Sequence, residues 1–143
     1  MPKIFRSMLA EGEKPKVGRE SKMLGVRIPP DPYADVPVDL NGHVHPQTGG
    51  MSVAPDWRKL PYFLIPERLK SFVPRARGKN DLVCWSLGEG DFESTTLNDH
   101  LELRVDQGHS PKHGVVEPKF EMLIDNFQAA LAQTGDLWVI DEK

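Results

Sequence analysis

The sequence predicts a single α+β domain with short, mainly antiparallel strands and two or three helices. A chain of 143 residues suits one domain that buries roughly 70% of the surface its unfolded chain exposes. Its 13 prolines and 12 glycines exceed ordinary usage and indicate many turns and loops. Several short apolar or alternating runs and one long amphipathic stretch complete the pattern. We therefore expect one domain over residues 1–143.

The N-terminal part contains two predicted strands and a long extended connection. Residues 3–9 alternate in the manner of a strand, which places the charged Arg6 on an otherwise apolar face. The polar segment 10–22 is expected to be a loop, and residues 23–28, MLGVRI, a second strand. The segment 29–37 holds four prolines in nine residues, which excludes helix interior and central strand.

The middle of the chain predicts two more strands separated by short helical turns. Residues 51–54, MSVA, suit a short strand, and Asp56 is placed to cap a helical turn over 57–60. A proline at the first helical position favours a second short helix over 66–70. The continuous apolar run 82–87, LVCWSL, is typical of a buried strand.

The C-terminal part contains the longest predicted helix. Residues 88–100 are expected to be a loop, followed by strands at 101–105 and 115–117 and a last strand at 137–140. Residues 119–133 predict an amphipathic helix that packs on a sheet, since apolar side chains recur at helical spacing. This apolar stripe consists of Phe120, Leu123, Ile124, Phe127, Ala130 and Leu131.

Composition and charge argue against several classes of function. There are 18 basic and 21 acidic residues with no block of five or six like charges, so nonspecific nucleic-acid binding is not favoured. The N-terminus lacks the apolar core of a signal peptide, and no apolar run approaches the ~20 residues that cross a bilayer. The single cysteine, Cys84, permits no disulfide within the chain. We expect a cytosolic protein without membrane contact, with delivery to another cell by a signal-less secretion route left open.

The histidines give only weak support for a metal site. His43 and His45 have the spacing of two ligands on one strand face, and His109 and His113 have a second ligand-like spacing. However, a glycine pair occupies the place where a cupin-type site has a carboxylate, and no HExxH motif occurs. The sequence also lacks GxSxG, P-loop and GxGxxG motifs. We therefore expect no metal site.

Three polar residues on strand-like segments remain as candidates for chemistry. Arg6 is the only ionised residue of its strand, Ser52 follows the Gly49–Gly50 pair, and Glu117 follows two valines. Each has an ordinary structural explanation: an edge charge reaching solvent, a turn serine, and an acid favoured at a helix entry. Their order along the chain is more informative than any one of them.

That order carries a resemblance to a known class. The stretches IFRSML, TGGMSV and HGVVEPKFEMLIDNF resemble bacterial effector toxins of the type VI secretion system that belong to the ADP-ribosyltransferase-like class. The similarity spans residues 3–134. It implies a compact ADP-ribosyltransferase-like fold, with two small mainly antiparallel sheets around a cleft and a few helices.

The resemblance also implies a substrate and site residues. NAD would be the substrate, with ADP-ribose transferred to a protein side chain, a nucleic acid or water. A guanidinium can hold the pyrophosphate, glycines admit close backbone approach, and a carboxylate stabilises the oxocarbenium-like transition state. The expected catalytic residues are Arg6, Ser52 and Glu117, and the expected NAD-binding residues are Arg6, Gly49, Gly50, Ser52, Trp57, Tyr62 and His113.

Two alternatives stay beside this hypothesis. Met51 stands where a threonine is expected, which favours a noncatalytic nucleotide- or protein-binding module of the same fold. A metal-dependent enzyme using His43 and His45 ranks third. By resemblance, an effector of this kind would also have a cognate immunity protein as partner.

Overall fold

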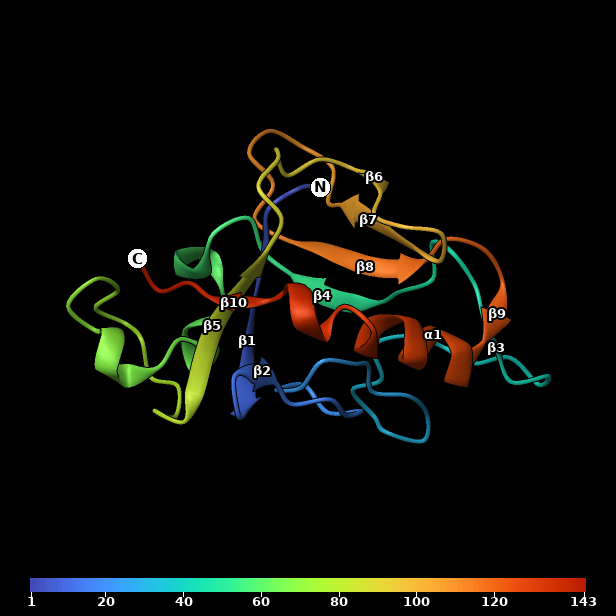
Figure 1. Ribbon diagram of the computed structural model, residues 1–143, viewed down its shortest axis with the longest axis horizontal. Coiled ribbons are helices and arrows are strands. Elements are labelled where there is room, and N and C mark those ends of the chain that lie inside the picture. Colours follow the sequence, from blue (N-terminus) through green and yellow to red (C-terminus); the bar gives the residue numbers. More distant parts are fainter.

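Two four-stranded antiparallel sheets meet at one residue pair in the computed structural model, which describes residues 1–143 (Figure 1). The first sheet has the strand order β10-β5-β1-β2, and its strands are β1 (Ile4–Glu11), β2 (Lys14–Pro15), β5 (Leu82–Leu87) and β10 (Val139–Ile140). The second has the order β4-β8-β7-β6, and its strands are β4 (Met51–Val53), β6 (Thr95–Thr96), β7 (Leu101–Val105) and β8 (Gly114–Pro118). The predicted α+β class with mainly antiparallel sheets is confirmed.

The junction between the sheets consists of Phe5 and Ala54. The Phe5 amide donates to the Ala54 carbonyl at 2.8 Å, and the Ala54 amide donates back at 2.9 Å. Beyond this pair no backbone hydrogen bond joins β1 to β4. The edge of β1 is therefore open beside Arg6, and this opening positions the site described below.

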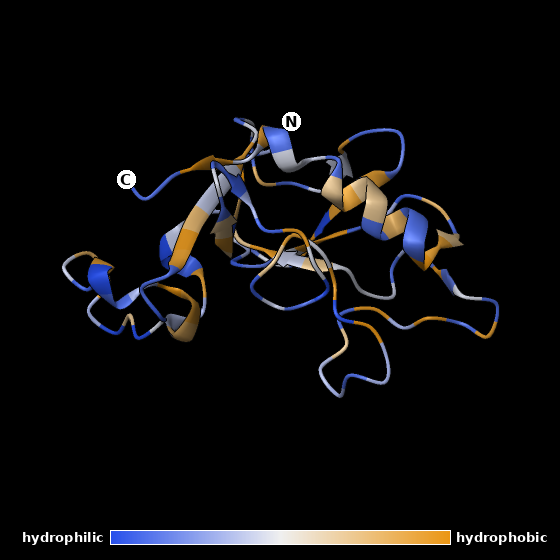
Figure 2. Ribbon diagram, turned by 60° about the horizontal axis from the view of Figure 1, so that its bottom comes forward, coloured by the Kyte–Doolittle hydropathy of each residue, from blue (hydrophilic) through white to orange (hydrophobic).

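The single α-helix is shorter than predicted. It spans α1 (Ile124–Ala132) and buries Phe127, Ala130 and Leu131, which confirms the C-terminal half of the apolar stripe. The prediction that the helix begins at residue 119 is wrong, because β9 (Met122–Leu123) pairs with β3 (His43–Val44) immediately before it. Phe120 and Leu123 are consequently exposed. Figure 2 shows hydrophobic and hydrophilic colours alternating along this helix.

The helical turns between β4 and β5 are 3₁₀ helices. They are η1 (Trp57–Lys59), η2 (Tyr62–Leu64) and η3 (Glu67–Leu69), and a fourth, η4 (Gly135–Leu137), follows α1. The predicted cap is confirmed, since the Asp56 carboxylate accepts from the Arg58 amide at 3.0 Å. No helix is long and apolar enough to cross a membrane.

Separate apolar clusters lie on the two faces of the first sheet. The main core contains Ile4, Met8 and Trp85 together with the inner faces of the second sheet and α1. The opposite face carries a smaller core around Trp57 and Ile65, into which Phe5 and Cys84 point. Strand alternation produces this division, because neighbouring residues of β1 and β5 face opposite sides.

Two of the predicted strands are wrong or shorter than expected. Residues 23–28 form no strand; Leu24 makes only an isolated bridge with Val17, so the segment covers the core as a loop. The last predicted strand keeps only Val139 and Ile140, since Leu137 belongs to η4. The two-residue strands β2, β3, β6 and β9 carry too few residues to show an alternation.

The second sheet requires a residue without a side chain at Gly50. A Cβ there would overlap the Val116 carbonyl of β8, whereas a Cβ on Gly135 meets nothing closer than 4.0 Å. Gly50→Ala is expected to lower the free energy of unfolding by about 1–3 kcal/mol through overpacking. The matched control Gly135→Ala should stay within about 1 kcal/mol of wild type in urea denaturation. Equal losses in both variants would contradict the steric explanation.

Candidate functional site

A cleft of about 400 Å³ opens where β1 and β4 separate. Its walls come from both sheets, from the loop after β2, from residues 59–64, and from the loop before β8. The volume falls within the ~300–1,000 Å³ typical of small-molecule sites. The charged and titratable residues that line it are Arg6, Arg27, Asp35, Lys59, Lys112 and His113.

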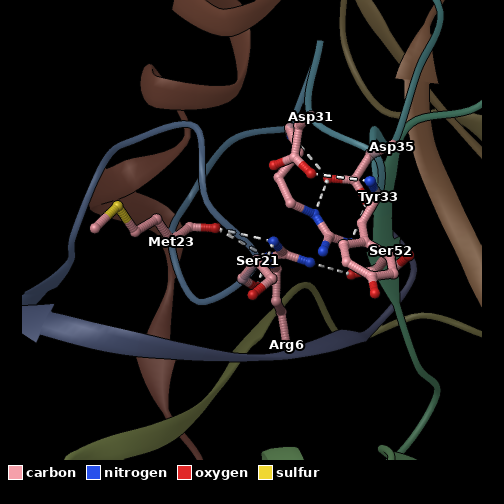
Figure 3. A network of polar contacts seen from close by, with 8 residues as sticks. Arg6, Ser21, Met23, Asp31, Tyr33, Asp35 and Ser52 are labelled. Carbon is pink, nitrogen blue, oxygen red and sulfur yellow. Dashed lines mark hydrogen bonds and ion pairs between the residues drawn. The ribbon is translucent and has the colours of Figure 1, made fainter. Parts of the chain in front are cut away.

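Arg6 is the central polar residue of the cleft. Its side chain is 6% exposed and donates to three backbone carbonyls (Figure 3). Nη1 bonds Ser52 at 2.8 Å, Nη2 bonds Ser21 at 3.0 Å, and both Nε and Nη2 bond Met23, at 3.2 and 3.0 Å. The residue thus ties β1 to β4 and to the 21–23 loop, and is no edge charge reaching solvent.

The charge of Arg6 has no carboxylate of its own. Burial lowers the pKa of its guanidinium to about 10, while the charge of Asp35 acts in the opposite direction, so the group stays protonated at neutral pH. Asp35 is held by Arg27, which bonds it from Nε at 3.2 Å and from Nη2 at 2.9 Å. A buried cation without a bonded anion favours an anionic ligand.

The rim of the cleft adds further positive charge. Lys59 and Lys112 are exposed and make no ion pair, and His113 lies 3.1 Å from Asp106 through Nδ1. Asp35 is the only carboxylate that lines the cleft. The balance of charge therefore suits a ligand that bears phosphate groups.

Ser52 lies in the same cleft and leaves its hydroxyl free. The side chain is exposed, and only its backbone carbonyl is bonded, by Arg6. The preceding glycines do not line the cleft: Gly49, at a φ of 146°, sits against the Asp35 carbonyl, and Gly50 against β8. They allow the backbone packing that places Ser52, and an NAD contact from them stays a prediction.

The two aromatic residues expected to bind NAD lie outside the cleft. Trp57 is buried in the smaller core and donates from Nε1 to the Lys143 carbonyl at 3.1 Å. Tyr62 is exposed beside Arg75. The aromatic side chain that lines the cleft is Phe63, the next residue of the same 3₁₀ turn. Sequence reasoning missed it because a single turn gives no periodicity that tells which ring faces inward.

Glu117 does not join Arg6 and Ser52. Its side chain is 1% exposed and accepts from Arg104 Nε at 2.6 Å, in a hollow formed with β7 outside the cleft. Glu102 faces it across the sheet, and burial followed by the bond to Glu117 raises the pKa of Glu102. The structure therefore brings together Arg6, Ser52 and His113, and leaves Glu117 paired elsewhere.

His43 and His45 have carboxylate partners that local sequence did not reveal. His43 Nδ1 lies 2.6 Å from Glu121 Oε1, and His45 Nε2 lies 2.8 Å from Asp39 Oδ2. The ligand atoms of Asp39, His45 and Glu121 lie within 4.8 Å of one another. The direct pairs already explain both histidines, because His43 ties β3 to the residue before β9 and His45 pairs with Asp39 of its own segment. The metal-dependent alternative stays a prediction.

Comparison with protein-family models and with curated protein sequences gives no match.

Arg6 and Ser52 are expected to differ sharply in their effect on stability. Arg6→Ala leaves three partly buried carbonyls without a donor, which costs at least about 2 kcal/mol of unfolding free energy. Ser52→Ala removes an unbonded hydroxyl and should change it by less than about 0.5 kcal/mol. Urea denaturation of both variants measures this. A neutral Arg6→Ala would contradict the tie between the sheets.

Asp39 is expected to contribute an acid-sensitive part of stability. Hydrogen bonds from the His43 amide and the His45 ring lower the pKa of Asp39 to about 2. Its contribution is complete above the unfolded pKa of about 3.9 and is lost as pH falls through the folded value. Asp39→Asn should melt below wild type at pH 7, with the gap closing between about pH 4 and 2. A constant gap in thermal denaturation across that range would contradict this.

Proposed function

We propose that the cleft binds NAD and that the protein is an ADP-ribosyltransferase-like enzyme, which transfers ADP-ribose to an acceptor or hydrolyses NAD. The observation that carries the proposal is a buried, carboxylate-free Arg6 guanidinium in the same cleft as the free Ser52 hydroxyl. The order of these residues along the chain, which resembles the ADP-ribosyltransferase-like effectors, supports the same assignment.

The pyrophosphate of NAD is assigned to the cationic side of the cleft. An arginine has five N–H donors, and the four contacts of Arg6 leave one on Nη1 for a ligand. Lys59 and Lys112 can approach the same phosphates from the rim. Charge-assisted bonds of this kind contribute about 1.5–3 kcal/mol each.

The nicotinamide riboside is assigned to Ser52 and Phe63, which line the same cleft. The Ser52 hydroxyl is free to bond a ribose oxygen, and the ring of Phe63 offers a face for the planar nicotinamide. In the reaction, the bond between ribose C1′ and the nicotinamide nitrogen breaks, and its electron pair leaves with nicotinamide. The acceptor then bonds C1′ and gives up a proton, and a carboxylate beside the ribose stabilises the positive charge between these events.

Two carboxylates are candidates for that last role. Glu117 is the one that the resemblance implies. Its side chain would have to leave Arg104 and turn into the cleft to take this role. Asp35 already lines the cleft but is held by Arg27. Because both are neutralised by arginines, a noncatalytic NAD-binding module is the second candidate function.

The binding proposal predicts which substitutions weaken NAD. Lys59→Ala and Lys112→Ala each remove one phosphate contact and should raise Kd about 10-fold or more. Ser52→Ala should also weaken binding, while Lys16→Ala, on the loop after β2 outside the cleft, serves as the matched control and should leave Kd unchanged. Titration calorimetry measures all four, and nicotinamide release reports the reaction.

The outcomes separate the candidates. Nicotinamide release that is lost in Glu117→Gln or in Asp35→Asn, with NAD still bound, supports the enzyme and identifies its carboxylate. Binding without release supports the module. Absence of NAD binding by wild type rejects both. The toxin or effector role, delivery to another cell and an immunity partner follow from the resemblance alone, and growth of cells that express wild type or Ser52→Ala tests the toxicity.

A further inference from the structure

The segment between β4 and β5 concentrates the positive charge of the protein. Residues 57–80, here called the basic lobe, hold seven of the 18 basic residues and one of the 21 acidic residues, Glu67. The rest of the chain is left with 11 basic against 20 acidic residues. The net charge of −3 therefore conceals a strong separation of charge between the lobe and the rest of the chain. The basic residues of the lobe are interleaved with apolar ones, so they form no long block of like charge.

Several of these cations are free. Arg58, Arg68 and Lys70 pair with carboxylates of Asp56, Glu142 and Glu67. The other four are exposed and have no carboxylate partner: Lys59, Arg75, Arg77 and Lys79. Free cations on one segment attract an anionic partner more strongly than cations whose charge is already matched.

The lobe also exposes aromatic rings. Tyr62, Phe63 and Phe72 are 42%, 54% and 59% exposed, while the smaller core beneath them is filled by other side chains of the lobe. Arg75 lies over the Tyr62 ring at 5.9 Å, and Phe72 rests edge-on against Trp57 at 6.2 Å. Tyr62 and Phe72 are therefore held by neighbouring side chains, and all three rings stay accessible.

The lobe borders the cleft. Lys59 and Phe63 belong to the lobe and also line the cleft, so the positive surface continues into it. In Figure 1 the lobe is the green segment that projects on the left beside β5, away from α1. A ligand held on the lobe can thus reach the cleft along Lys59 and Phe63.

We propose that the basic lobe binds single-stranded nucleic acid. Phosphates would contact Lys59, Arg75, Arg77 and Lys79, and bases would stack on Tyr62 and Phe63, the combination of charge and rings by which proteins hold single strands without reading sequence. A strand is favoured over an acidic protein because its repeating phosphates and planar bases match both components of the surface. Strand binding does not require NAD, and because Lys59 and Phe63 are also assigned to NAD under the proposed function, the two ligands would compete for these residues.

The test is fluorescence anisotropy with a labelled 20-nucleotide oligouridylate at several salt concentrations. Four phosphate contacts predict a slope of log K against log salt of about −3, from about −0.7 per contact on single strands. Arg75→Glu/Arg77→Glu should weaken binding at least 10-fold and reduce the slope by about 1.4. Tyr62→Ala/Phe63→Ala should weaken binding about 10-fold or more through lost stacking.

The matched control is Lys16→Glu/Lys119→Glu, which makes the same change in net charge at two exposed lysines outside the lobe. Its affinity should stay within about twofold of wild type, since both lysines lie outside the proposed contact surface and interactions between exposed charges are weakened by salt. Circular dichroism and melting temperature establish folding, and Arg75→Gln/Arg77→Gln replaces the charge reversal if that variant does not fold.

Three results would overturn the proposal: no binding by wild type at low salt, equal loss in the control variant, or equal binding of polyglutamate with no effect of the aromatic substitutions. The last result would assign the lobe to an acidic protein. NAD titrations of Arg75→Glu/Arg77→Glu keep the two proposals separate, because neither arginine lines the cleft and NAD affinity should be that of wild type.

Discussion

The guanidinium of Arg6 joins β1, β4 and the 21–23 loop at the point where the two sheets part. Its burial carries a desolvation cost that carbonyl dipoles offset, and Asp35 contributes only from a distance because Arg27 holds it. The Arg6 guanidinium therefore both links these segments and gives the cleft a positive charge that no bonded carboxylate neutralises. Structure and ligand preference follow from the same placement.

The first sheet has two apolar faces, and this decides where the functional surfaces lie. One face supports the main core with α1 and the second sheet, and the other supports the basic lobe. The cleft opens at the edge between them, with Arg6 from the sheet on one side and Lys59 from the lobe on the other. Three separate parts of the chain thus meet around one concave, positively charged surface.

Patterns that repeat were predictable from the sequence, and contacts between distant segments were not. Alternation and apolar runs predicted β1, β5, β7 and β8, and helical spacing predicted the buried side of α1. The two-residue strands have no period to detect, and the pairing of β3 with β9 shortened the helix. Arg6 and Ser52 were predicted in one cleft. No local sequence pattern indicated that Arg104 would bond Glu117.

The reactivity of Cys84 can report on the packing of the lobe against the first sheet. This single thiol points from β5 into the smaller core under the lobe, and burial raises its pKa to about 12. It is consequently unreactive while the lobe is seated, since the thiolate is the nucleophile. Its alkylation rate would report how often the lobe lifts from the sheet, separately from unfolding of the main core, and so whether a bound strand clamps or loosens that part of the molecule.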